Sequence, residues 1–155
     1  MEERLKELRE PQPLGDALPG SGLHATLRPY QKTGVTWLRF LTKLGLGACL
    51  ADDMGLGKTV QVIALLLHIK KERCEKEGKA KAPPALLVLP ASLLSNWKSE
   101  LEKFAPTLSV HFVHPSQLDA EGMKRAAADP GTFLSGADAV LTTYGMLARL
   151  EWLSS

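Results

Sequence analysis

The sequence of 155 residues predicts an α/β fold built on a parallel sheet. Two observations lead to this fold class. From residue 85 onward, short apolar runs of strand length alternate with helical patterns, which is typical of βαβ units with right-handed crossovers. Earlier in the chain, a glycine-containing loop at residues 52–59 follows a short apolar run and precedes a long apolar stretch, as in a phosphate-binding strand–loop–helix.

The N-terminal part of the chain predicts a linker, a helix, a strand and a second helix. Residues 1–22 are a charged segment followed by a stretch rich in proline and glycine, so we expect a folded domain over residues 23–155. Residues 30–44 predict a helix, because large apolar side chains recur at the spacing of one helical face: Trp37, Phe40, Leu41 and Leu44. Residues 48–51 predict a buried strand. Residues 60–69 predict a helix that is apolar on both faces and therefore packs on a sheet.

The C-terminal half predicts three strands and three helices. The strands are expected at residues 85–89, 109–113 and 138–142, and the helices at residues 92–104, at about 116–128 and from about residue 144. Ser92 is expected to cap its helix, and Trp97 is expected to pack in the core. The charged run at residues 70–81 fits a solvated helix end and loop better than a patch that binds the DNA backbone.

Composition argues against several functional classes. A formal net charge of +2 gives no general attraction to nucleic acid, so DNA binding would need locally placed donors. Cys49 in the expected strand and Cys74 in a charged helix tail form no disulfide or zinc framework, and we expect a structural role for Cys49. The four histidines lack metal-ligand spacing, and His68 with Glu72 is spaced as a helix-surface pair.

The sequence also carries no sign of a membrane segment. The longest apolar run is far shorter than a membrane span, and the charged N-terminus is unlike a signal peptide. We therefore expect an intracellular, cytoplasmic protein that is nucleoid-associated if it binds DNA.

The loop at residues 52–59 carries the chemistry of a nucleotide site. Its glycines allow the backbone to close around a triphosphate, Lys58 would reach the β and γ phosphates, and the Thr59 hydroxyl would ligate a magnesium ion. Asp52 stands where the strict pattern has its first glycine. Because a carboxylate repels a triphosphate, we expect Asp52 and Asp53 to accept hydrogen bonds from backbone N–H groups of the loop.

This loop resembles that of the Swi/Snf-type DNA-dependent ATPases of helicase superfamily 2. The resemblance rests on the run Asp52-Asp53-Met54-Gly55-Leu56-Gly57-Lys58-Thr59 and on three more segments in the family's order. Residues 27–31 (Leu-Arg-Pro-Tyr-Gln) resemble its adenine-reading motif. Residues 87–90, continued by Ser92, Asn96, Trp97 and Glu100, resemble its first DNA-contacting motif, and residues 139–144 resemble the next one.

The resemblance implies an incomplete RecA-like lobe, with ATP and Mg²⁺ as cofactors and double-stranded DNA as the partner of the intact protein. Lys58 is the implied catalytic residue, and Thr59 is the implied metal ligand. The implied nucleotide-binding residues are Gln31, Asp53, Met54, Gly55, Leu56, Gly57, Lys58 and Thr59. The implied DNA-binding residues are Pro90, Ser92, Asn96, Thr142, Thr143 and Tyr144, and Lys98 is a further candidate for a phosphate contact.

The family's acidic Asp-Glu box and its second RecA-like lobe have no counterpart within the 155 residues. We therefore expect the chain to be the first part of an ATP-binding lobe and to be inactive alone as an ATP hydrolase. The alternative is a non-catalytic nucleotide- or DNA-binding module that works at this length. A P-loop kinase or GTPase is a weaker option, because no base-recognition motif or lid is visible.

Overall fold

The computed structural model describes residues 22–75 and 83–153, and these residues divide into two compact units, with the division between Glu72 and Arg73. Of the segment expected at residues 1–22, only residue 22 is described. Of the charged run at residues 70–81, the structure describes residues 70–75, and the rest lies outside the described residues. None of the described helices is long and apolar enough to cross a membrane.

The first unit contains helix α2 (Pro29–Lys43) and all but the last three residues of helix α3 (Lys58–Glu75), and these helices confirm the two expected in this part of the chain. Pro29 stands at the first helical position of α2, where a missing N–H costs nothing. No residue from 58 to 70 is exposed, as expected for a helix that is apolar on both faces. A small core joins Leu27, Val35 of α2 and Ala64 of α3.

The prediction of a strand at residues 48–51 is wrong. These residues have no regular secondary structure, and three of the four, including Cys49, are exposed. A strand exists only where a neighbour supplies backbone hydrogen bonds, and the described part of the first unit contains no other strand. The prediction that Cys49 has a structural role in a buried strand is therefore wrong as well.

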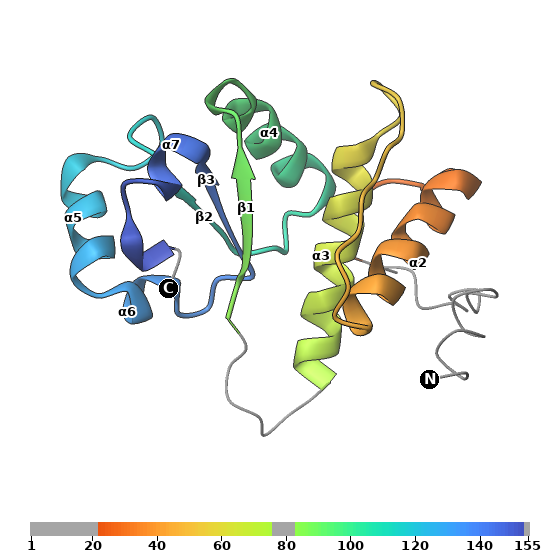
Figure 1. Cartoon of the computed structure of the whole chain (residues 1–155), viewed down its shortest axis with the longest axis horizontal. Helices are drawn as coiled ribbons and strands as arrows, with labels where there is room; N and C mark the ends of the chain where they lie inside the picture. Colours follow the sequence, from red (N-terminus) through yellow and green to blue (C-terminus); the bar gives the residue numbers. More distant parts are fainter. Residues whose placement is uncertain (1–21, 76–82, 154–155) are drawn as a thin grey trace. The chain divides into compact units, whose positions relative to one another are not determined.

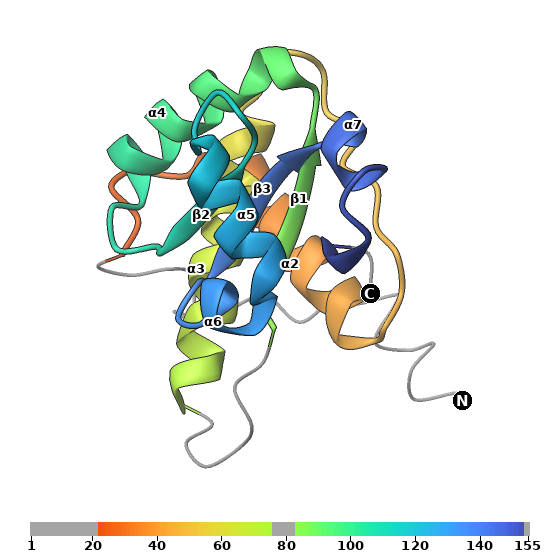
Figure 2. The ribbon, with the colours of Figure 1, turned by 90° about the vertical axis from the view of Figure 1, so that its left-hand side faces the viewer.

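The second unit is a three-stranded parallel sheet of β1 (Ala85–Leu89), β2 (Val110–Val113) and β3 (Ala139–Thr143). The strand order is β1-β3-β2, and Figure 2 shows β3 between its two neighbours. All five residues of β3 are buried, because β3 is the central strand and is covered on both faces. Three predicted strands are thus confirmed, each within one residue at either end.

Helices of the second unit cover both faces of the sheet. The connection from β1 to β2 contains η1 (Ala91–Leu93) and α4 (Leu94–Phe104), and the return to β3 contains α5 (Ala120–Ala128) and α6 (Pro130–Leu134). Right-handed crossovers that run in opposite directions along the sheet place α4 and α5 on opposite faces, as Figure 1 shows. Two short helices, α7 (Tyr144–Leu147) and η2 (Glu151–Leu153), follow β3.

Three details of these helices differ from the expectation. Ser92 does not cap a helix: it lies inside η1, and the residue before α4 is Leu93, which makes no side-chain cap. Helix α5 begins four residues later than expected, because the Asp119 carboxylate accepts a hydrogen bond from Gly122 N and sets the start there. The sequence pattern does not predict helix α6. Trp97 is 8% exposed, which confirms its place in the core.

Candidate nucleotide-binding site

The loop before α3 owes its path to two glycines. Gly55 and Gly57 have φ angles of 83° and 78°, in the left-handed region that glycine adopts without strain. A Cβ atom on Gly57 would lie 2.5 Å from Nε2 of Gln31, so a larger residue at this position would force the Gln31 side chain to shift. Met54 at the tip is 96% exposed. The glycine spacing in the sequence thus corresponds to a real conformational requirement.

The Lys58 ammonium lies inside the loop. It donates hydrogen bonds to the backbone carbonyls of Asp52 and of Asp53, the latter at 2.7 Å. Lys58 is also the first residue of α3, where free backbone N–H groups and the helix dipole favour an anion. The arrangement places a cation and a helix N-terminus together at the mouth of the loop.

Gln31 and Tyr30 tie the start of α2 to this loop. Gln31 is buried, its Oε1 accepts a hydrogen bond from Arg28 N at 2.9 Å, and its Nε2 donates to Leu56 O at 3.0 Å. The Tyr30 hydroxyl donates to the same carbonyl at 3.0 Å. Gln31, which the resemblance assigns to adenine, is therefore also a support of the loop. An amide has two N–H donors and two acceptor sites, so one of each is still available.

The carboxylate of Asp52 does not accept from the loop backbone as expected. It accepts instead from the side chain of Gln61, with 2.8 Å between Gln61 Nε2 and Asp52 Oδ2. Gln61 is a site residue that sequence reasoning missed. The available signal was a lone amide in an otherwise apolar stretch of α3, at a position that the helical pattern buries.

An ion cluster joins α2 and α3 within the first unit. Oε1 of Glu72 lies 2.7 Å from Arg39 Nη2, 3.1 Å from Lys43 Nζ and 3.2 Å from His68 Nε2. Burial raises the pKa of Glu72, but hydrogen bonds from the three partners and the Lys43 charge outweigh it and lower the pKa from 4.5 to about 2. His68 is 5% exposed, so its expected place on the helix surface is wrong.

The segments expected to contact DNA follow neighbouring strands of the second unit. Leu89 at the end of β1 pairs with Thr143 at the end of β3, so the two following loops leave the same edge of the sheet. Pro90, Ser92 and Asn96 are all exposed. Asn96 Nδ2 donates to Glu100 Oε1 at 3.0 Å. This part of the expected DNA-facing surface is accessible.

The two threonines of the second segment are not accessible. Thr142 is fully buried, and its Oγ1 donates to Val113 O at 2.9 Å, so this hydroxyl is engaged within the fold. Thr143 is 6% exposed, and its Oγ1 accepts from Met146 N at 3.3 Å as the N-cap of α7. Tyr144, at 65% exposed, presents its side chain to the surface.

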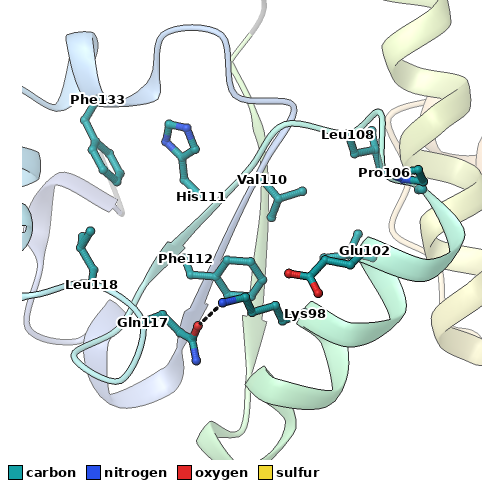
Figure 3. A pocket seen from close by; sticks show the side chains of 12 residues that line it. Lys98, Glu102, Pro106, Leu108, Val110, His111, Phe112, Gln117, Leu118 and Phe133 are labelled. Atoms are coloured by element: carbon teal, nitrogen blue, oxygen red, sulfur yellow. Dashed lines mark hydrogen bonds between the residues drawn. The ribbon is translucent and has the colours of Figure 1, made fainter.

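A cavity of about 440 Å³ lies along β2, at the edge of the sheet. Figure 3 shows Val110 and Phe112 on one face of β2 and His111 on the other, as the alternation of side chains along a strand requires. The His111 and Phe133 rings make an edge-to-face contact with 4.9 Å between centroids. Lys98 Nζ donates to Gln117 Oε1 at 3.0 Å, so this candidate for a phosphate contact is engaged within the second unit.

Known proteins resemble this chain in sequence and in structure. The SNF2-related domain matches residues 30–154. The putative ATP-dependent helicase/translocase YwqA of Bacillus subtilis is 48% identical over 132 residues, which cover 84% of this chain and 13% of that protein. The Drosophila melanogaster homolog of the SWI/SNF-related regulator of chromatin, subfamily A containing DEAD/H box 1, is 40% identical over 127 residues, 82% of this chain and 14% of that protein.

Solved structures agree with these relatives. The Sulfolobus solfataricus SWI2/SNF2 ATPase core in complex with dsDNA matches with a TM-score of 0.72 and 40% identity, over 93% of this chain and 26% of that chain. The Sulfolobus solfataricus SWI2/SNF2 ATPase core domain matches as well, with a TM-score of 0.66 and 43% identity, over 86% of this chain and 24% of that chain. The chain therefore spans about a quarter of those structures and a seventh or less of the two curated relatives.

Proposed function

The chain belongs to the SNF2-related family, and from that premise we propose that it is the nucleotide-binding part of an ATPase lobe that moves along double-stranded DNA. The observation that carries the proposal is the Lys58 ammonium inside a loop bent by two left-handed glycines at a helix N-terminus. These groups fit a phosphate anion. A bound phosphate would take over Lys58 from the carbonyls of Asp52 and Asp53.

The residues of the loop divide the work of holding ATP and Mg²⁺. Lys58 would bind the β and γ phosphates, the Thr59 hydroxyl would hold Mg²⁺, and the backbone N–H groups of residues 53–57 would surround the phosphates. Gln31 selects adenine with its remaining N–H and lone pair while it continues to support Leu56. Bound ATP supplies the phosphoanhydride bond whose hydrolysis drives movement in the intact protein.

We further propose that DNA lies along the sheet edge where β1 and β3 end. Exposed Pro90, Ser92 and Asn96, with the exposed ring of Tyr144, would contact phosphates without reading sequence. Thr142 and Thr143 contribute by fixing the path of the loop, because their hydroxyls are engaged within the fold. Because ATP and DNA are both found inside the cell, we also propose an intracellular location, with association with the nucleoid when the protein is on DNA.

A titration of the chain with a fluorescent ATP analogue in the presence of Mg²⁺ tests the nucleotide site. Lys58→Ala removes a charge-assisted contact typically worth about 1.5–3 kcal/mol, so affinity is expected to fall about ten- to a hundredfold. Lys124→Ala, at an exposed position of α5, is the matched control and is expected to change nothing. Equal affinity in the Lys58→Ala variant and the unaltered chain would refute the site.

Competition with GTP tests the role of Gln31. The unaltered chain is expected to prefer ATP, and Gln31→Ala is expected to narrow that preference. Equal affinities of the unaltered chain for ATP and GTP would remove adenine selection from Gln31 and leave it as a support of the loop.

A further inference from the structure

We propose that Gln61 is a positioning residue of the nucleotide loop, whose buried amide binds the Asp52 carboxylate and keeps that acid turned away from the phosphates. The inference rests on the proposed nucleotide site and deepens it. It explains how a carboxylate can occupy the position where the strict phosphate-loop pattern has glycine.

The burial of Gln61 implies that its amide has a specific task. The side chain is 0% exposed, and burying an amide is costly unless it is hydrogen-bonded. Its Nε2 donates to Asp52 Oδ2 at 2.8 Å. The carboxylate can only accept, so it determines which end of the amide faces it.

The carbonyl end of the same amide packs against Gly34 and makes no hydrogen bond among the described residues. Gln61 Oε1 is buried and has no hydrogen-bond partner among the described residues. A Cβ atom on Gly34 of α2 would overlap with Oε1, so a larger residue at position 34 would displace the amide from its present place. An unsatisfied carbonyl oxygen destabilises the fold, and the bond to Asp52 is the only compensation among the described contacts of this side chain.

Asp52 connects this amide to Lys58. Its carboxylate is bound by Gln61, while its backbone carbonyl accepts from the Lys58 ammonium. Gln61 and Lys58 both lie in the first turn of α3, so Asp52 is attached to that turn at two points. Without Gln61 the carboxylate is free to turn toward the anion, which it would repel, and the carbonyl that orients Lys58 loses its support.

Exchange of the two side chains tests the inference, with the full chain and the same ATP-analogue titration. Gln61→Glu places two carboxylates together and is expected to lower affinity about tenfold or more. Adding Asp52→Asn restores an amide–carboxylate pair with its partners exchanged, and this double variant is expected to regain most of the affinity. Gln117→Glu, the same change in the second unit, is the matched control.

Urea denaturation of each variant separates loss of binding from loss of folding. If Gln61→Glu does not fold, recovery of both folding and affinity in the double variant still supports the inference. Unchanged affinity in Gln61→Glu overturns it, and so does a double variant that folds normally but does not regain affinity. If Lys58→Ala binds the ATP analogue as tightly as the unaltered chain does, the nucleotide site itself is refuted, and the inference about Gln61 with it.

Discussion

Replacement of Glu72 by Gln tests whether the ion cluster between α2 and α3 stabilises the first unit. The substitution keeps the size of the side chain and an acceptor oxygen for Arg39 but removes the charge that Arg39, Lys43 and His68 share. Arg39 Nε is already buried without a hydrogen-bond partner among the described residues, so the guanidinium depends strongly on Glu72. We expect the variant to be less stable at neutral pH.

The magnitude follows from the lowered pKa of Glu72. A pKa that falls from 4.5 to about 2 on folding corresponds to about 3 kcal/mol, at about 1.4 kcal/mol per unit. The Glu72 side chain is 26% exposed and that of Lys43 is 55% exposed, so screening by solvent reduces the expected contribution to about 1–2 kcal/mol.

The direction of the pH dependence follows from the same values. Because the folded pKa lies below the unfolded one, the contribution is fully present above pH 4.5 and is lost as the pH falls toward about 2. The free energy of unfolding in urea is to be measured for the unaltered chain and for Glu72→Gln from neutral pH down to about pH 2. The two values should differ at neutral pH and converge in acid. A difference that stays constant from neutral pH down to the acid limit would refute the role given to Glu72.

Two further predictions concern the loop and the strand end. Gly57→Ala is expected to destabilise the chain by about 1–3 kcal/mol, through strain at positive φ and contact with Gln31. Gly55→Ala, where φ is similar but the space is open, is expected to destabilise it less. If urea denaturation shows the same loss of unfolding free energy in the two variants, the contact with Gln31 plays no part. Thr143→Ala removes the N-cap of α7, which is typically worth about 1 kcal/mol. In the full-length protein this variant is expected to lower DNA-stimulated ATP hydrolysis and to leave nucleotide affinity unchanged. Thr143→Ser, which keeps a hydroxyl for the cap, is expected to keep the DNA stimulation. Loss of ATP binding, or intact DNA stimulation, in Thr143→Ala would show that this loop does not serve DNA.

The success of strand prediction depended on what surrounds each apolar run. The run 85–89 is bounded by prolines on both sides and belongs to a series of strands that pair with one another, so its limits were predictable. The run 48–51 is as apolar, but strand pairing is a property of two segments, and an apolar pattern describes only one. Helix starts failed for a related reason, since Ser92 and Asp119 both suit a cap and only Asp119 meets a free N–H.

The chemistry of the site was predictable where it depends on local spacing. Gly55, Gly57 and Lys58 lie within one loop, so their roles follow from the sequence pattern. The bond between Asp52 and Gln61 spans nine residues and depends on how the loop bends back over α3, which no pattern records. Burial of Thr142 and Thr143 depends on β3 being the central strand, and strand order is a property of the assembled sheet.

The pairing of β1 with β3 also bears on how this part of the protein can vary. The loops after Leu89 and Thr143 are neighbours because of the ladder between these strands, and the length of chain between them plays no part. Insertions or deletions at the surface turns between α4 and β2, or between α5 and α6, would therefore leave the distance between the two loops unchanged. Lineages could lengthen or shorten these connections to suit new partners while the spacing of the two loops stays constant.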